Sequence, residues 1–243
     1  MIDIGVSDRV FVLTGAGVSA ESGLPTFRGA GGLWRGYRVE DVASPVAWAR
    51  DPLMVWQFYS MRRKAHRGKQ PNPAHLALAK LEKALGERLF LCTQNVDKLH
   101  EQAGSRRVVH MHGRLFQSRC DRCYRPPFDD ENCYEDHVPR CDCGGQIRPH
   151  ICWFGEMPYE LERIARELER CTVFMAVGTS GVVYPAAAFV AQARASGKQR
   201  VRTYYVGPEE PANRALFNEC FLGKAGESLP RLFHWSQLSA ISV

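Results

Sequence analysis

The sequence contains no apolar run of about 18 residues, the length that a membrane-spanning helix requires. Its first residues, MIDIGVSDR, lack the basic start and the apolar stretch of a secretory signal. Internal repeats and low-complexity tracts are also absent. We therefore expect no membrane association and a cytoplasmic location, although a processed mitochondrial protein would have the same features.

A strong charge imbalance is missing as well. The formal net charge is +6, and the basic residues are scattered along the chain. This balance permits acidic partners, but without a basic cluster we do not expect nucleic acid as the main partner. A chain of 243 residues, 45% of them hydrophobic, can bury an ample core as one large domain or one domain with an insertion. We expect a monomer.

The nine cysteines are an odd number in a chain without an export signal, which favours reduced thiols or a metal over a disulfide framework. Cys120-x-x-Cys123 and Cys141-x-Cys143 are separated by 17 residues, in a segment with so little periodicity that we expect no hydrophobic core to hold it. Four thiolates suit one tetrahedral, structural zinc ion. The second pair is more tightly spaced than usual, so Cys133 remains a spare ligand. A group of free cysteines remains the alternative.

A glycine turn follows the first apolar run, in RVFVLTGAGVSAESGLPTFR at residues 9–28. The run from Val10 to Leu13 predicts a buried strand, and Gly15-Ala16-Gly17 predicts a sharp turn into a short helix that ends near Ser22. Backbone N–H groups at such a turn can bind a phosphate, and glycine lets the ligand approach without a Cβ in the way. The pattern by itself fits a dinucleotide site or a plain strand-to-helix turn.

Strands and helices alternate through the rest of the chain, which predicts an α/β fold with a Rossmann-like parallel sheet and helices on both faces. Strands are expected at residues 88–93, 107–111, 173–177 and 201–206, and helices at 74–85, 96–103, 159–170 and 184–195. After the first helix, a glycine-rich loop and a helix from Pro52 to about His66 take the place of a second strand. We expect a smaller domain made of a helical insertion (36–72) and a zinc-binding module (116–147), and a Rossmann-like domain made of 1–35, 73–115 and 148–243.

Polar side chains gather where two expected strands end. Gln94-Asn95-Val96-Asp97 follows one strand at its carboxyl end, where open α/β sheets bind ligands, and could hold a ribose or a carboxamide. His110-Met111-His112-Gly113 ends the next strand, in which the two histidines would point to the same face. An imidazole with a pKa near about 6.5 can act as a base near neutral pH. His112 is therefore a candidate base, with a hydrogen-bonded structural histidine as the alternative.

Together these stretches resemble the sirtuin family of NAD-dependent protein-lysine deacylases. The resemblance rests on GAGVSAESGLPTFRG (15–29), QNVDKLHEQAG (94–104), HMHG (110–113), the paired cysteines, RPHICWFGEMP (148–158) and GTSGVVYPAA (178–187). The motifs stand in the family's order and cover nearly the whole chain.

The resemblance implies that His112 is the general base. In the family, the acyl-lysine carbonyl oxygen attacks the anomeric carbon of NAD and expels nicotinamide, after which the histidine activates a ribose hydroxyl. The products would be free lysine, nicotinamide and O-acyl-ADP-ribose. One zinc ion would be structural and remote from this chemistry.

The resemblance also implies which residues bind NAD and an extended substrate peptide. For NAD these are the loop residues Gly15, Ala16, Gly17, Ala20, Thr26, Phe27 and Arg28, the nicotinamide and ribose residues Gln94, Asn95 and Asp97, and the phosphate-side residues Gly178, Thr179 and Ser180. For the peptide, paired strand to strand, they are Trp153, Phe154, Gly155, Glu156, Val182, Val183 and Tyr184. Phe27 would shield the reactive centre from water and nicotinamide.

A further match refines the acyl group. Tyr59-x-x-Arg62 places two side chains on one face of the inserted helix, and it resembles the signature of class III sirtuins, which remove succinyl, malonyl and glutaryl groups. An arginine fork can bind a carboxylate with two hydrogen bonds beside a tyrosine hydroxyl. Ala43 resembles the small residue that widens the acyl pocket, and Arg63 should point elsewhere. The alternatives are a surface arginine beside a core tyrosine, and an enzyme that is mainly a deacetylase.

The chain also departs from the family pattern. Family members usually carry an Asn near the end of the strand at 201–206, where it contacts the adenosine, whereas the aligned position here is Val206, followed by Gly207-Pro208. That contact with the adenosine is therefore lost or moved. The zinc loop is also short, and among the four cysteines this affects the assignment of Cys143 as a ligand most. Two rivals remain: an ordinary nicotinamide dehydrogenase, and a zinc-bearing module that binds acylated peptides or nucleic acid without turnover.

Overall fold

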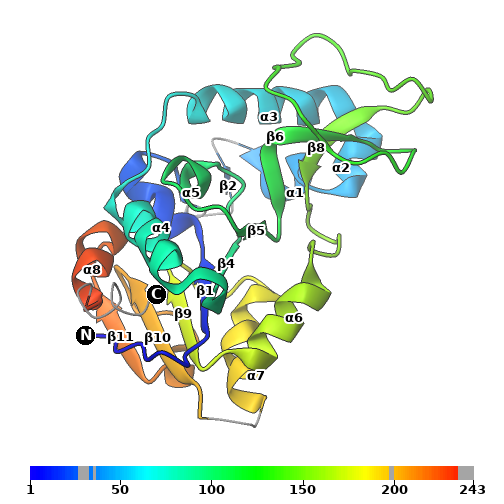
Figure 1. The fold of residues 1–243 in the computed structure, drawn as a ribbon. Coiled ribbons are helices and arrows are strands. Elements are labelled where there is room, and N and C mark those ends of the chain that lie inside the picture. Colours follow the sequence, from blue (N-terminus) through cyan, green and yellow to red (C-terminus); the bar gives the residue numbers. More distant parts are fainter. Residues whose placement is uncertain (27–32, 35–36, 197–199, 235–243) are drawn as a thin grey trace.

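The computed structural model describes residues 1–26, 33–34, 37–196 and 200–234 (Figure 1). Its larger part is built on a six-stranded sheet with the order β11-β10-β9-β1-β4-β5, in which every neighbouring pair is parallel. The strands are β1 (Val10–Thr14), β4 (Leu89–Thr93), β5 (Val108–His110), β9 (Val173–Val177), β10 (Arg202–Gly207) and β11 (Glu219–Leu222). The predicted Rossmann-like α/β fold is confirmed.

Strand β1 lies inside the sheet, between β9 and β4, and all five of its residues are buried. Its side chains alternate between two hydrophobic cores, with Val10 and Val12 in one and Phe11 and Leu13 in the other. This continuous apolar run is typical of a parallel strand that helices cover on both faces.

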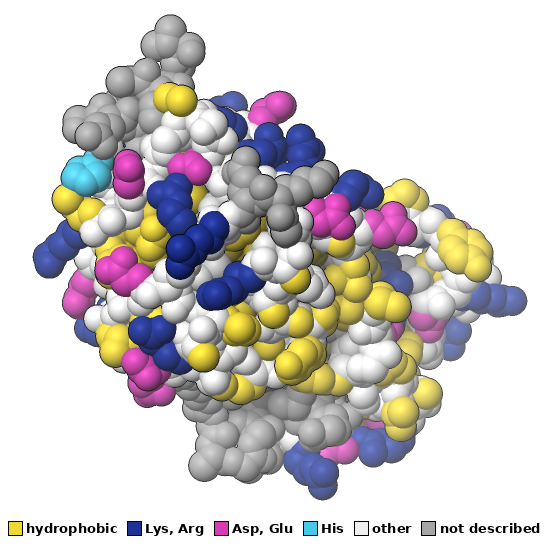
Figure 2. All heavy atoms as spheres, turned by 90° about the horizontal axis from the view of Figure 1, so that it is seen from below, with side chains coloured by type: hydrophobic (Ala, Val, Ile, Leu, Met, Phe, Trp, Pro, Cys, Tyr) yellow, Lys and Arg dark blue, Asp and Glu magenta, His cyan; other side chains and the backbone are white. Residues whose placement is uncertain are grey.

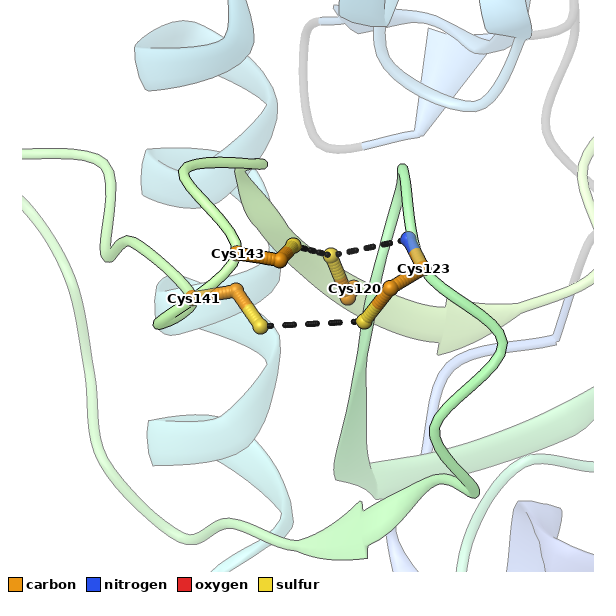
Figure 3. A group of neighbouring side chains, drawn as sticks. All are labelled: Cys120, Cys123, Cys141 and Cys143. Carbon is orange, nitrogen blue, oxygen red and sulfur yellow. Dashed lines mark hydrogen bonds between the residues drawn. The ribbon is translucent and has the colours of Figure 1, made fainter.

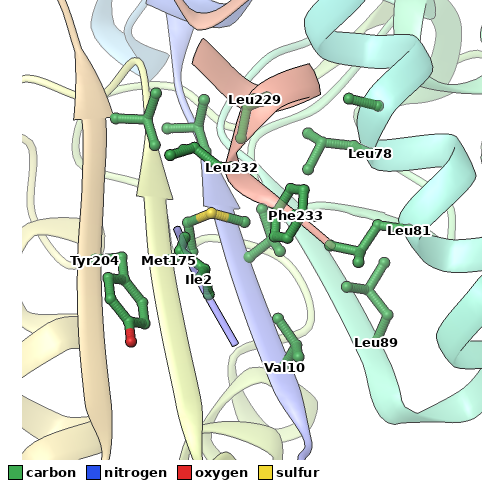
Figure 4. Close-up of a cluster of buried hydrophobic side chains, with 14 of the residues drawn as sticks. Ile2, Val10, Leu78, Leu81, Leu89, Met175, Tyr204, Leu229, Leu232 and Phe233 are labelled. Atoms are coloured by element: carbon green, nitrogen blue, oxygen red, sulfur yellow. The ribbon is translucent and has the colours of Figure 1, made fainter. Parts of the chain in front are cut away.

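Two helices cover each face of the sheet (Figure 1). On one face lie α4 (Pro73–Leu85) and α8 (Ala225–Leu232), and Figure 4 shows Leu78, Leu81 and Leu229 of these helices over Val10 and Met175 of the strands. On the other face lie α6 (Leu161–Arg170) and α7 (Phe189–Ala195). The two cores hold the sheet rigid, so the loops at its carboxyl edge have fixed anchors.

The smaller part combines helices with an antiparallel sheet. The helices are α1 (Val39–Val42), α2 (Pro45–Arg50) and α3 (Pro52–His66), and the sheet has the order β7-β6-β8, made of β7 (Phe128–Asp129), β6 (Gly113–Cys120) and β8 (Ile147–Ile151). β2 (Leu33–Trp34) and β3 (Tyr37–Arg38) form a separate two-stranded sheet. Helix α3 has the predicted limits because Asp51 caps the N–H of Met54 at 2.9 Å and proline occupies the first position.

The cysteine module has a hydrophobic core, so the expectation that it would lack one was wrong. Cys120, Cys141 and Ile147 of the module pack in one hydrophobic cluster with Trp56 and Tyr59 of α3. The module and the helical insertion therefore stabilise each other. β6 begins at Gly113 and β8 continues to Ile151, so both strands cross the predicted limits at 115 and 148, and the domain division stays a prediction.

Several predicted helices differ in length or type. The helix after the glycine turn is a 3-10 helix (Ala16–Ser22), and the helix expected from Val96 shortens to α5 (Leu99–Gln102) because the carboxylate of Asp97 accepts the N–H of Leu99. Short 3-10 helices also occur at Gly86–Arg88, Ala186–Ala188 and Arg214–Leu216. Within the described ranges, no helix combines the length and the apolar character needed to cross a membrane.

Candidate active site and metal centre

A cavity of about 860 Å³ opens at the carboxyl edge of the parallel sheet, next to the smaller part. It brings together every predicted NAD, acyl and peptide residue that the structure describes. These are Gly15, Ala16, Gly17, Ala20, Thr26, Gln94, Asn95, Asp97, His112, Gly178, Thr179, Ser180, Ala43, Tyr59, Arg62, Trp153, Phe154, Gly155, Glu156, Val182, Val183 and Tyr184. Phe27 and Arg28 lie outside the described residues.

The glycine turn and the loop after β9 meet backbone to backbone. The N–H of Gly15 donates to the carbonyl of Val177 at 3.0 Å, and that of Gly17 donates to the carbonyl of Gly178 at 2.9 Å. A Cβ on Gly17 would lie 2.7 Å from the Cα of Gly178. Only glycine permits this approach, which leaves a narrow backbone cradle of the kind that fits a dinucleotide.

Hydrogen bonds to Gly15 and Ser19 fix the side chains of Asn95 and Asp97 next to this cradle. Asn95 donates through Nδ2 to the carbonyl of Gly15 and to Ser19 Oγ, both at 3.1 Å. Ser19 Oγ in turn donates to Asp97 Oδ2 at 3.0 Å. Burial raises the pKa of Asp97, although the N–H of Leu99 and the hydroxyl of Ser19 oppose that effect. The group is pre-oriented before any ligand binds.

Two buried histidines, which were not identified from the sequence, pack next to this hydrogen-bond network. His75 lies 3.4 Å from Ser19 Oγ, His100 lies 3.0 Å from Thr14 Oγ1, and the two ring centroids are 4.9 Å apart. Burial lowers the pKa of His75 to about 4 and that of His100 well below its usual value. Both rings are therefore neutral at pH 7.

His112 is placed as a base. Its Nδ1 donates to the carbonyl of Gln94 at 3.1 Å, which leaves the Nε2 lone pair as the basic site. Burial lowers the pKa of His112, and the bond to Gln94 offsets part of that effect. The imidazole is thus neutral and able to accept a proton at neutral pH.

The two histidines of the motif do not share a face, so that expectation was wrong. Strand β5 ends at His110, and residues 111 and 112 form a turn, so the alternation of a strand does not apply to them. His110 is buried between the carbonyl of Asn95 (2.9 Å) and the carboxylate of Glu101 (2.8 Å), and only His112 lines the cavity.

Helix α3 presents Tyr59 and Arg62 to the same cavity. The guanidinium carbon of Arg62 lies 5.6 Å from the centre of the Tyr59 ring, and the Tyr59 hydroxyl accepts a hydrogen bond from Trp153 Nε1 at 3.0 Å. Ala43 lines the wall beside them. The next residue, Arg63, is fully buried away from the cavity, where it pairs with Asp130 at 3.2 Å.

The predicted peptide segments lie on the cavity wall. Phe154, Val182 and Tyr184 are exposed apolar side chains that a ligand could cover. The carboxylate of Glu156 is already engaged by Arg148 at 2.7 and 3.0 Å and by the N–H of Trp153 at 2.8 Å. Glu156 therefore fixes the turn that carries Trp153 and Phe154. On the face that Figure 2 shows, basic side chains lie among acidic ones and do not form one patch.

Residues to which the sequence assigned no role line the cavity at the end of β10 and the start of α8. They are Gly207, Pro208, Lys224 and Ala225. Val206 is fully buried in the core and its carbonyl accepts the N–H of Gly178 at 2.8 Å, so its side chain cannot contact a ligand. A Cβ at Gly207 would overlap the hydroxyl of Tyr205, which donates to the carbonyl of Thr179 at 3.1 Å. Here Tyr205 fills the space that a side chain at 207 would need.

The four named cysteines converge on one point (Figure 3). Their sulfur atoms all lie within 4.8 Å of one another, with Cys120 to Cys143 at 3.5 Å and Cys123 to Cys141 at 3.8 Å. Zinc–sulfur bonds of about 2.3 Å in a tetrahedron require sulfur separations of about 3.8 Å, so the residues fit one closed zinc site. Cys133 lies apart, with its thiol 3.7 Å from the carbonyl of Ser60, and is not a replacement ligand.

The Cys120 thiol is prepared for metal binding. Burial raises its pKa, but the N–H groups of Cys123 and Arg122, at 3.4 and 3.3 Å, and the neighbouring thiols outweigh this and lower the pKa to about 7. A thiolate is the form that zinc binds. None of the four cysteines is among the described residues that line the cavity, which agrees with a structural ion.

The sequence is similar to that of known proteins over most of its length. The profile of the Sir2 family matches residues 15–185. A Caulobacter vibrioides protein named NAD-dependent protein deacylase is 49% identical over 226 residues, covering 91% of this chain and 94% of its own length. A Vibrio cholerae protein of the same name is 47% identical over 227 residues, covering 92% and 91%.

Solved structures agree over nearly the whole chain. A Sir2 homologue in complex with NAD superposes with a TM-score of 0.86 at 42% identity, covering 98% of this chain and 92% of that one. A Sir2 protein with a deacetylated p53 peptide and 3'-O-acetyl ADP-ribose gives 0.80 at 30% identity, covering 91% of each chain. The resemblance to the sirtuins is therefore confirmed: the chain belongs to the Sir2 family.

Proposed function

We propose that this protein is an NAD-dependent protein-lysine deacylase that favours negatively charged acyl groups, succinyl and malonyl above all and glutaryl as a further candidate, with weaker deacetylase activity. One observation carries the proposal: a single cavity joins the glycine cradle, the neutral His112 and the Tyr59–Arg62 face of α3. The names of the relatives support the deacylase activity.

The residues of the cradle fit NAD. Gly15, Gly17 and Gly178 would accommodate the diphosphate, and Asn95 and Asp97, already oriented by Ser19, would hold the nicotinamide amide. When bound, NAD supplies the ADP-ribose that accepts the acyl group and releases nicotinamide. Water exclusion by the buried walls would favour this transfer over hydrolysis.

The Nε2 atom of His112 would accept a proton from a ribose hydroxyl. Its Nδ1–H stays bound to the carbonyl of Gln94, so the tautomer and the ring direction are fixed during the reaction. Because its pKa is lowered by burial, the base form persists at and below neutral pH.

The proposed acyl preference rests on the guanidinium of Arg62 and the hydroxyl of Tyr59 in the cavity wall. Arg62 would bind a distal carboxylate with two hydrogen bonds, Tyr59 would donate a third, and Ala43 would leave room for the longer chain. An acetyl group offers no carboxylate to this wall, so its turnover should be slower.

An extended peptide would lie between residues 153–156 and 182–184, with its acyl-lysine directed into the cavity. One structural zinc ion would close the cysteine module and take no part in the chemistry. We also propose a monomer without nucleic-acid or membrane partners.

The test is incubation with NAD and either a succinyl-lysine or an acetyl-lysine peptide, followed by measurement of nicotinamide, deacylated peptide and absorbance at the NADH wavelength. We expect nicotinamide release that depends on the acyl peptide, continued turnover to deacylated peptide that depends on His112, and no NADH. NADH formation would favour a dehydrogenase, and peptide binding without turnover would favour a binding module. Faster turnover of acetyl-lysine would mark a plain deacetylase.

A further inference from the structure

The hydrogen bond between Trp153 and Tyr59 joins the peptide side of the cavity to the acyl side. Trp153 Nε1 lies 3.0 Å from the Tyr59 hydroxyl oxygen, and both residues are at most 2% exposed. An indole N–H can only donate, so the phenol oxygen must be the acceptor. The hydroxyl proton of Tyr59 is then directed to a different partner.

Tyr59 keeps that proton. Burial raises the pKa of its phenol, although the nearby Arg62 and the bond from Trp153 oppose the effect. A neutral phenol whose oxygen already accepts one bond is oriented as a donor. Because Tyr59 and Arg62 line the same cavity, an acceptor placed there by a ligand meets two donors.

Trp153 is itself held by an ion pair. The guanidinium carbon of Arg148 lies 3.2 Å from the centre of the Trp153 ring. Glu156 binds that guanidinium at 2.7 and 3.0 Å and also accepts the backbone N–H of Trp153 at 2.8 Å. This partly buried pair therefore fixes both the ring and the backbone of Trp153.

We propose that Trp153, held by Arg148 and Glu156, is a positioning residue that directs the hydroxyl proton of Tyr59 toward the carboxylate of an acidic acyl group. This rests on the proposed acyl preference and adds a residue that acts through Tyr59. Its effect should therefore appear in acyl selectivity and depend on the presence of the Tyr59 hydroxyl.

The test is a double-mutant cycle with Trp153→Phe and Tyr59→Phe. Phenylalanine keeps an aromatic ring against Arg148 but removes the N–H. We measure kcat/KM with succinyl-lysine and acetyl-lysine peptides at saturating NAD for the wild type, both single variants and the double variant. Trp153→Phe should lower the succinyl-to-acetyl ratio about two- to tenfold, the value of one ordinary hydrogen bond. In the Tyr59→Phe background it should change the ratio no further.

Trp56→Phe is the matched control. Its indole N–H is also buried and donates to the carbonyl of Ile147 at 2.8 Å, but Trp56 does not line the cavity. We expect this variant to lower the melting temperature and to leave the succinyl-to-acetyl ratio unchanged.

The proposal is overturned if Trp153→Phe lowers both efficiencies equally, or if it lowers the ratio by the same factor with and without the Tyr59 hydroxyl. If Trp153→Phe does not fold, Glu156→Gln replaces it in the cycle, with a smaller effect expected in the same direction and the same outcome overturning the idea. A wild-type ratio near one would instead contradict the proposed acyl preference itself, so the two failures are distinguishable.

Discussion

Arg62 and Arg63 are neighbours on α3 but have different surroundings. Arg62 lines the cavity, whereas Arg63 is fully buried and binds Asp130 at 3.2 Å and the carbonyl of Leu115 at 2.8 Å. The same helix thus carries a ligand-facing arginine and an arginine that fastens the cysteine module to it.

This difference predicts unequal losses of stability when either arginine is replaced by methionine. Arg63→Met leaves the carboxylate of Asp130 buried without its partner, so it should destabilise the protein by about 3–5 kcal/mol. Arg62 lines the cavity instead of the buried core, so Arg62→Met should lower the free energy of unfolding less than Arg63→Met does. Denaturant titration of both variants checks this. Equal stability losses would show that the two side chains do not divide the roles as described.

The pH dependence of catalysis should follow His112. Because the base must be neutral, kcat/KM falls as the pH drops through its pKa, which burial lowers below the usual 6.5. The acid limb of the kcat/KM profile should therefore have its midpoint below pH 6.5. His112→Asn should reduce deacylation by about 10²- to 10⁴-fold. A midpoint at or above 6.5 would contradict the buried, neutral base.

Zinc should be required for folding of the cysteine module. Cys141→Ser should lose the ion and lower the melting temperature, because a closed thiolate site contributes directly to stability. Cys133→Ser is the control and should keep one zinc per chain, since its thiol faces the carbonyl of Ser60. Metal analysis of the purified variants decides between them. Zinc loss in Cys133→Ser would show a different ligand set.

Stability should decline on mild acidification because of buried neutral histidines. Burial lowers the pKa of His75 to about 4, while an unfolded histidine keeps a value near 6.5, so the unfolded state binds more protons between these pH values. The contribution is full above pH 6.5 and falls by roughly 1–2 kcal/mol at pH 5. His75→Gln should flatten the melting temperature between pH 7 and 5.

Local signals in the sequence explain which elements were predictable. The limits of α3 and of strand β9 matched because a capping residue with proline and a five-residue apolar run are set by neighbours in the chain. The cysteine spacing likewise predicted a cluster that the fold forms. β11 and α8 were not predicted.

The features that the sequence did not predict depend on contacts between segments that are distant along the chain. The core shared by Trp56 and Ile147 joins elements about ninety residues apart, so the weak periodicity of the cysteine module hid it. His75 and His100 join the site only through Ser19 and Thr14. From the sequence, Gly207 looks like an ordinary loop residue. In the structure, the hydroxyl of Tyr205 occupies the space that a side chain at 207 would need.

The most direct test of the proposed function is the succinyl-to-acetyl ratio of kcat/KM for the wild type and Arg62→Met. A charged hydrogen-bonded pair that loses one partner costs about 2–5 kcal/mol, so desuccinylation should fall by about thirtyfold or more while acetyl-lysine turnover changes far less. An unchanged ratio in Arg62→Met would contradict recognition of the acyl carboxylate by this helix face.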